Sequence, residues 1–171
     1  MSGRHLRKLV DFMADWGVRG ICIGGGGEPL MNREVWGLLP YISERGMEPA
    51  VVTNGSLMDE VIIAEMMQCR WVGISLDAGD REAFRRVHGV DFFDRVVQNL
   101  TRLVEKKAQT AARVSIACKL LLHPANLDSL YPACRLAKAI GVDDSHVRPM
   151  DTERLGLQDL RITPGDLARL P

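Results

Sequence analysis

Apolar residues along this chain alternate between helical spacing and short continuous runs. Residues 4–17 place five large apolar side chains on one predicted helical face and stop at Gly17: Leu6, Leu9, Val10, Met13 and Trp16. Further helices are predicted at residues 34–46, with an interruption near Pro40, and at residues 58–70, 92–108 and 129–141. Apolar runs predict strands within residues 20–23, 48–55, 71–79, 112–126 and 144–151.

This alternation predicts an α/β fold. The predicted strands read as apolar on both faces, which is typical of a parallel sheet covered by helices with right-handed crossovers. In such sheets ligands bind at the carboxyl ends of the strands. Polar and glycine-rich segments follow every predicted strand: GGGGEP, TNG, SLDAG, CKLLLHPAN and VRPMD. We therefore expect one functional edge within a domain of residues 1–151, followed by a polar tail of residues 152–171.

Charge and hydropathy exclude several partner classes. The 171-residue chain has 22 basic and 22 acidic residues, so no net charge favours nucleic acid or an anionic membrane. No apolar run approaches the ~20 residues that span a bilayer, and the N-terminus has no signal-peptide core, so we expect a cytoplasmic protein. The four cysteines lie far apart in sequence and are expected in the core, Cys22 within its apolar strand.

Four consecutive glycines, residues 24–27, precede Glu28 and Pro29. They match neither the dinucleotide pattern G-x-G-x-x-G nor the phosphate loop G-x-x-x-x-G-K-[ST]. A carboxylate here would repel a phosphate but accept hydrogen bonds from an ammonium group. Pro29 favours an extended Glu28. The residues alone leave two alternatives: a binding site for an amino ligand, or a glycine-rich turn with a capping acid.

The ordered succession of these segments resembles the radical S-adenosylmethionine (SAM) superfamily over roughly residues 5–151. The resemblance rests on GVRGICIGGGGEPLMN, AVVTNGSLM, WVGISLDAGDREAFRRVHGVDFFDRVVQNL, VSIACKLLLHPAN and HVRPMD. It implies a partial (β/α)6 TIM-like barrel of parallel strands with outer helices. It also implies a [4Fe–4S] cluster and SAM, whose cleavage yields a 5′-deoxyadenosyl radical that abstracts hydrogen from a substrate.

The first part of the implied SAM site follows the first two predicted strands. Gly26, Gly27 and Glu28 resemble the superfamily's GGE motif, which receives the methionyl amino group, and Pro29 closes that motif. Thr53 and Asn54 resemble the next strand exit, which lines the SAM pocket.

The second part of the implied SAM site follows the later strands. Ser75 and Asp77 resemble the polar residues near the ribose and methionyl ends of SAM. Ile116 and Val147 would flank the adenine, and Lys119 would pair with the SAM carboxylate.

Four further polar residues have a functional and a structural interpretation. His123, Arg148 and Asp151 are candidates for the substrate side, although Arg148 and Asp151 fit a surface ion pair equally well. For His88, between a predicted strand and the next helix, a structural role is favoured.

The superfamily's cluster motif, C-x3-C-x2-C, does not occur in this sequence. We therefore expect no metal ligands in the chain, a missing first strand and cluster loop, and a truncated domain that is not competent alone. The alternative is a non-catalytic SAM-like binding or scaffold module that has lost the cluster. A phosphate-binding TIM barrel is a weaker rival, because the tail offers no late glycine-rich loop. The substrate, a small molecule or a peptide, is not identified, and an open sheet edge predicts self-association.

Overall fold

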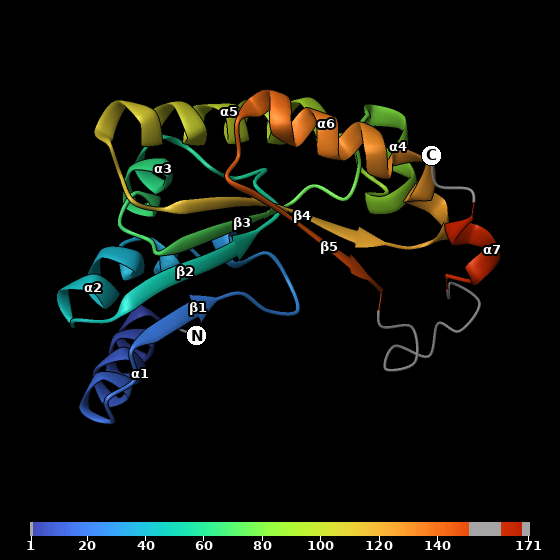
Figure 1. The fold of residues 1–171 in the computed structure, drawn as a ribbon. Helices are drawn as coiled ribbons and strands as arrows, with labels where there is room; N and C mark the ends of the chain where they lie inside the picture. Colours follow the sequence, from blue (N-terminus) through green and yellow to red (C-terminus); the bar gives the residue numbers. More distant parts are fainter. Residues whose placement is uncertain (1, 151–161, 169–171) are drawn as a thin grey trace.

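The chain folds into one five-stranded parallel sheet with helices packed along it (Figure 1). The computed structural model describes residues 2–150 and 162–168, so Asp151 and most of the tail lie outside the described residues. The strands are adjacent in chain order: β1 (Gly20–Ile23), β2 (Glu48–Thr53), β3 (Trp71–Ser75), β4 (Ser115–Leu122) and β5 (Asp144–Pro149). The predicted α/β class and the five strand positions are confirmed.

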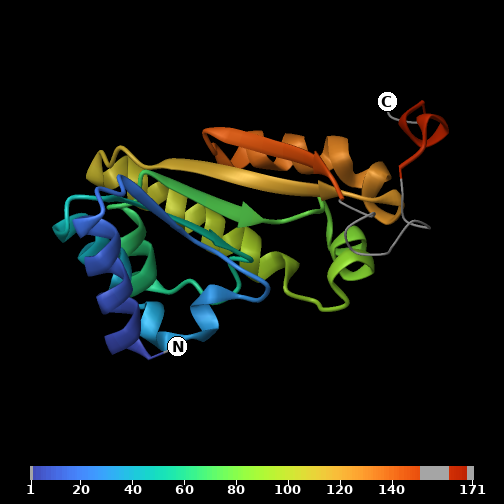
Figure 2. The ribbon, with the colours of Figure 1, turned by 90° about the horizontal axis from the view of Figure 1, so that it is seen from below.

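Seven α-helices and three short 3-10 helices occupy the described residues. The α-helices are α1 (Gly3–Asp15), α2 (Leu38–Glu44), α3 (Glu60–Met66), α4 (Arg81–His88), α5 (Phe93–Thr110), α6 (Leu130–Ile140) and α7 (Pro164–Leu167). The 3-10 helices are η1 (Pro29–Met31), η2 (Arg33–Val35) and η3 (Pro124–Ser129). Helices α1, α2, α3, α5 and α6 each pack against the next of this series. They form the row that follows the sheet in Figures 1 and 2.

The main core lies between this helix row and one face of the sheet. Strand residues Val51, Ile74 and Ile116 are fully buried there, together with Ile62 of α3 and Leu100 of α5. Because side chains alternate along a strand, every second residue of each strand faces the helices. The remaining strand residues lie on the opposite face, which no described helix of the row covers.

That opposite face is built from small, polar and aromatic residues. The register aligns Ser75 with Lys119 and Lys119 with His146 across β3, β4 and β5. A Cβ on Gly73 would lie 2.3 Å from Cη2 of Trp71 and 2.9 Å from Cδ of Lys119. The Trp71 indole therefore lies across the bare Cα of Gly73. The expectation of strands apolar on both faces is wrong for β3 to β5.

Two further expectations are corrected at the β1 side of the sheet. Val10 of α1 is buried, but Leu9 and Trp16 are 41% and 77% exposed, because the face of α1 that meets α2 includes Leu6, Val10 and Met13. Cys22 is exposed rather than buried, because it lies on β1, an edge strand, on the face away from the helices.

Pro40 does not interrupt a helix. Helix α2 begins only at Leu38, after Gly37 with φ of 76°, so Pro40 lies in the first turn. Backbone N–H groups of the first turn have no intrahelical acceptor, so a proline there removes no helix hydrogen bond. Among residues 2–150 and 162–168, no helix combines the length and apolar character needed to cross a membrane.

Candidate functional site

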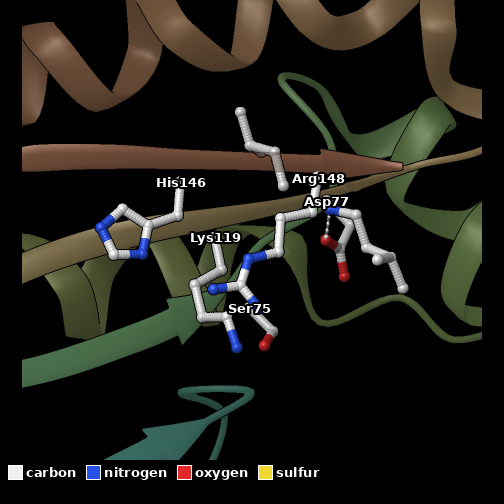
Figure 3. A pocket seen from close by; sticks show the side chains of 7 residues that line it. Ser75, Asp77, Lys119, His146 and Arg148 are labelled. Carbon is white, nitrogen blue, oxygen red and sulfur yellow. Dashed lines mark hydrogen bonds between the residues drawn. The ribbon is translucent and has the colours of Figure 1, made fainter. Parts of the chain in front are cut away.

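Two hollows lie side by side at the carboxyl ends of the strands. The first, the glycine-loop hollow, has a volume of about 190 Å³ and is lined by Gly25, Gly27, Glu28, Pro29, Val52, Thr53, Asn54 and Ser75. The second, the basic hollow, has a volume of about 180 Å³ and is lined by Ser75, Asp77, Lys119, Leu120, Leu121, His146 and Arg148 (Figure 3). Ser75 at the end of β3 lines both, so the two hollows adjoin.

The carboxylate of Glu28 ties the exit of β1 to the exit of β2. Its Oε1 accepts hydrogen bonds from the Thr53 hydroxyl at 2.5 Å and from the backbone N–H of Leu30 at 3.1 Å. Its Oε2 accepts the backbone N–H of Asn54 at 2.7 Å. A carboxylate has about four acceptor positions, so Oε2 keeps one for a further donor. Glu28 thus supports the loop and retains capacity for a ligand.

Helix α5 supports the segment that follows β2. Gly55 has φ of 75°, a left-handed conformation that favours glycine, and its Cβ would lie 3.1 Å from Cγ2 of Ile74. The buried Asn99 of α5 donates from Nδ2 to the Gly55 carbonyl at 2.9 Å. The Thr53 hydroxyl, besides donating to Glu28, accepts the Gly55 N–H at 3.1 Å. These bonds fix the wall of the glycine-loop hollow.

Nothing within the described chain requires glycine at residues 25–27. Gly25, Gly26 and Gly27 have no φ in the left-handed region, and a Cβ on any of them would meet no described atom within 4 Å. Neither backbone conformation nor packing within the chain therefore requires glycine there. Bare backbone beside a hollow fits a ligand that approaches the main chain closely.

The basic hollow brings two cations toward Ser75. Figure 3 shows the side chains of Lys119 on β4 and Arg148 on β5 extending toward Ser75. His146 forms a further side of the hollow, with its Nε2 2.8 Å from Oδ2 of Asp144. Its ring also stacks on Trp71, with centroids 5.4 Å apart and planes at 18°.

Asp77 supplies the carboxylate of this hollow. Its backbone has φ of 57°, in the left-handed region that Asp tolerates better than most residues. Its Oδ1 accepts the backbone N–H of Leu121 at 2.6 Å, and its Oδ2 lies 3.5 Å from Nε2 of His88. Burial raises the pKa of Asp77, while the Leu121 N–H and the charges of His88, Lys119 and His123 oppose that rise.

Beneath Asp77 the β4 exit is held by a buried amide. Asn126 donates from Nδ2 to the carbonyls of Asp77 and Leu121, at 2.8 and 2.9 Å, and its Oδ1 accepts the N–H of His123. Nδ1 of His123 in turn accepts the N–H of Ala125 at 3.3 Å. Burial lowers the pKa of His123, the charge of Asp77 opposes this, and the charge of His88 adds to it.

Most sequence-predicted positions lie at this edge. Gly27, Glu28, Pro29, Thr53 and Asn54 line the glycine-loop hollow, while Asp77, Lys119 and Arg148 line the basic hollow and Ser75 lines both. Gly26 lies within the same loop.

Besides Gly26, three predicted positions among the described residues line neither hollow. Ile116 is fully buried on the helix-covered face, and an odd spacing from Lys119 puts the two on opposite faces of β4. Val147 alternates with His146 and Arg148 in the same way on β5. His123 is buried as the N-cap of η3.

Four further residues that form or support the two hollows were not among the predicted positions. Trp71 and His146 could have been found from strand alternation, because they share a face with Ser75 and Arg148 respectively. Asn99 and Asn126 carry no comparable signal, since a polar residue in or beside a helix is usually exposed.

The described residues do not fit an iron–sulfur cluster. They contain no group of three or more His, Cys, Asp or Glu side chains arranged to hold a metal. Cys22 is exposed, Cys69 and Cys118 are buried, and Cys134 is half-buried on α6. Burial raises the pKa of both Cys69 and Cys118 to about 12, so neither thiol readily forms the thiolate that binds iron.

The sequence is similar to a family profile and to several known proteins. A profile of the Radical SAM superfamily matches residues 1–116. A probable GTP 3',8-cyclase from Saccharolobus islandicus (strain M.14.25 / Kamchatka #1) is 25% identical over 158 residues, which cover 91% of this chain and 49% of that protein. The chain spans about half the length, or less, of the curated relatives that it matches.

Solved structures share the fold at low identity. The chain superposes on Streptococcus suis SuiB bound to precursor peptide SuiA with a TM-score of 0.74 and 16% identity, over 99% of this chain and 38% of that one. SuiB bound to S-adenosylmethionine gives a TM-score of 0.68 and 15% identity, over 87% of this chain and 34% of that one.

Proposed function

The chain belongs to the radical SAM superfamily, and from this premise we propose that its glycine-loop hollow binds the methionyl end of S-adenosylmethionine. The proposal extends to the whole protein, which would be a radical SAM enzyme acting on an unidentified substrate. When bound beside a reduced cluster, SAM supplies hydrogen-abstraction chemistry in this superfamily.

One observation carries the proposal: Gly25 to Gly27 are glycines that nothing within the described chain requires. The solved neighbour SuiB, which shares the fold, has been determined with S-adenosylmethionine bound. A ligand that hydrogen-bonds the main chain of this loop explains why side chains are absent. An ammonium group suits the loop, because it donates to carbonyl and carboxylate oxygens but accepts nothing.

The residues of the hollow have distinct roles in this proposal. The loop carbonyls and the remaining acceptor position of Glu28 orient the amino group. Thr53 and Asn54 hold the Glu28 carboxylate in place by their hydrogen bonds. Ser75, which both hollows share, lies where the ligand passes from the glycine-loop hollow toward the basic hollow.

The residues that the structure describes offer no set of ligands for the cluster. We propose that its cysteines lie in a C-x3-C-x2-C segment outside the printed sequence. The second candidate is a SAM-binding module without a cluster, which the missing motif favours. The coding sequence upstream of Met1 discriminates between them, because an in-frame C-x3-C-x2-C supports the enzyme and its absence supports the binding module.

Calorimetric titration of the 171-residue chain with SAM tests the proposed site. The wild type is expected to bind, and Gly27→Ala is expected to weaken binding at least about tenfold, or about 1.4 kcal/mol, because its methyl group enters the hollow. Gly165→Ala, an exposed glycine of α7 whose Cβ would meet only Oγ1 of Thr163 at 3.7 Å, is the matched control. Absence of binding by the wild type, or equal binding by Gly27→Ala, would refute the site.

A further inference from the structure

We propose that the outer face of α1 is a dimerisation surface, on which a second copy of this chain packs its own α1 in the antiparallel direction. The inference goes beyond the proposed function and does not depend on it. Helix α1 lies at one end of the helix row (Figures 1 and 2) and lines neither hollow. Two neighbouring stripes of side chains on this helix, one apolar and one charged, indicate the partner.

The apolar stripe lies on the side of α1 that faces away from the core. Leu9, Phe12 and Trp16 are 41%, 52% and 77% exposed. The rings of Phe12 and Trp16 are in contact, with centroids 4.9 Å apart. Spacings of three and four residues put all three side chains on one helical face, whereas Val10 packs on the opposite side, against α2. Adjoining large apolar side chains on a surface are typical of a protein–protein contact.

The charged stripe runs beside the apolar one. Its members are separated by four, three and four residues, which keeps them on one helical face: Arg4, Lys8, Asp11 and Asp15. The N-terminal half of the stripe is therefore basic and the C-terminal half acidic. In the part of the chain that the structure describes, Arg4 and Lys8 have no hydrogen-bond or ion-pair partner. The acidic half is partly paired, because Asp11 lies 2.9 Å and Asp15 3.8 Å from Arg45.

The order of these charges opposes the dipole of α1. Acidic residues stabilise the first turn of a helix and basic residues the last turn. Helix α1 has no acidic residue in its first turn and no basic residue in its last turn, and Arg4 and Asp15 lie at the opposite ends from those that the dipole favours. The stability of the helix itself therefore does not explain the charge pattern. An antiparallel partner helix does explain it, because its acidic C-terminal half lies beside the basic N-terminal half.

One two-fold axis, between Leu9 and Phe12, fits both stripes. A two-fold interface pairs the same patch on both copies. Pairing Arg4 with Asp15 of the second copy also pairs Lys8 with Asp11 of that copy, because both pairs are symmetric about the same point of the helix. The same axis places Leu9 opposite Phe12 of the second copy. A parallel pair would instead bring the two basic halves together, which is unfavourable.

Analytical ultracentrifugation of the 171-residue chain over a wide range of concentrations tests the inference. The wild type is expected to show a monomer–dimer equilibrium. Trp16→Ser is expected to raise the dissociation constant of the dimer at least about tenfold, because large aromatic side chains dominate the affinity of interfaces. Val61→Ser, at an apolar side chain of α3 that is 57% exposed, is the matched control and should associate as the wild type does.

A charge swap tests the antiparallel direction. Arg4→Glu is expected to raise the dissociation constant at least about fivefold, because two symmetry-related pairs become repulsive. Adding Asp15→Arg to this variant is expected to restore wild-type association. At about 1.5 Å per residue the two positions lie about 16 Å apart along one helix, so restoration requires a contact between copies. Both substitutions agree with the helix dipole, so neither weakens α1 by itself.

Three outcomes overturn the inference. The first is a monomer at every concentration. The second is association that Trp16→Ser and Arg4→Glu leave unchanged, which would place the contact on another surface, such as the unpaired edge of β1. The third is failure of the double variant to regain association while its circular dichroism matches that of the wild type. Weakened association in Trp16→Ser, together with recovery in the charge swap, supports the antiparallel dimer.

Discussion

The carboxylate of Glu28 and the backbone N–H of Asn54 are joined by a 2.7 Å hydrogen bond across the exits of two neighbouring strands. The same carboxylate accepts the hydroxyl of Thr53, which is buried. A residue assigned to a ligand from the sequence is therefore also a structural link between β1 and β2. Stability and ligand binding at this loop have to be measured separately.

Glu28→Gln is expected to lower the free energy of unfolding by about 1–3 kcal/mol. The amide nitrogen of Gln cannot accept a hydrogen bond, so either Thr53 or Asn54 loses its acceptor. Urea unfolding followed by circular dichroism measures the change. Glu82→Gln, at a side chain that is 88% exposed, is the control and should stay within about 0.5 kcal/mol of the wild type. Equal effects of the two variants would contradict the link.

Substitution by alanine should have opposite effects on stability at two glycines that follow strands, Gly79 and Gly27. A Cβ on Gly79 would lie 2.2 Å from the backbone nitrogen of Ala133 and 2.4 Å from the carbonyl carbon of Pro132 on α6. Gly79→Ala is expected to cost about 1–3 kcal/mol of stability or more. Gly27→Ala meets no atom and should leave stability unchanged or raise it by up to about 1 kcal/mol. Thermal and urea unfolding compare them; a destabilised Gly27→Ala would mean that the chain itself requires this glycine.

The buried His123 should make stability depend on pH. Its pKa is lowered from 6.5, so between its folded pKa and 6.5 the unfolded state holds more protons than the folded state. The stability that the neutral His123 contributes is therefore fully present above pH 6.5, and it is lost as the pH falls from 6.5 through the folded-state pKa. Protonation of Nδ1 would also remove the acceptor for Ala125.

His123→Asn keeps an N-cap acceptor but does not titrate. The stability of the wild type, relative to this variant, is expected to decline as pH falls below 6.5. Urea unfolding of both proteins at a series of pH values measures the difference. Parallel stability curves would show that His123 titrates alike in the folded and unfolded states.

The cysteines should differ sharply in reactivity. Cys22 is exposed, whereas Cys69 and Cys118 are buried and burial raises their pKa to about 12. Iodoacetamide is expected to modify Cys22 in the native protein and to leave Cys69 and Cys118 unmodified, as peptide mass spectrometry would detect. All of them should react in denaturant. Rapid native modification of Cys118 would show that the β4 core opens readily.

The unpaired edge of β1 is expected to promote self-association. Within the described residues β1 pairs only with β2, and its outer edge exposes backbone donors and acceptors. Size-exclusion chromatography over a range of concentrations should show a larger species that grows with concentration. A monomer at every concentration would contradict this expectation.

Much of the fold and of the site could be predicted because both depend on local patterns. Apolar runs and helical spacing predict the five strands and the main helices, and parallel strands bring their exits to one edge. The glycine run, Glu28, Thr53 and Asn54 occur directly at such exits, so their meeting follows from topology alone. The predicted neighbourhood of Ser75 and Asp77 follows for the same reason.

The face on which a strand residue lies was harder to predict. Ile116 and Val147 stay predictions for the adenine of SAM, and each lies on the strand face opposite to residues that line the basic hollow. Cys22 was expected in the core, although an apolar run does not indicate that its strand lies at a sheet edge. The Cys22 error arises because burial depends on which neighbours cover each face of a strand, and sequence periodicity carries no information on them.

The sequence by itself determined the order of elements, the edge of the sheet where the candidate site lies and the superfamily, because these depend on periodicity and on short motifs. Only the tertiary structure decided which side chains meet. It brought Arg148 of β5 toward Ser75 of β3, stacked His146 on Trp71, and engaged Glu28 in holding two loops. These contacts join residues far apart in the chain, so they depend on strand register and packing, which no local stretch of sequence encodes.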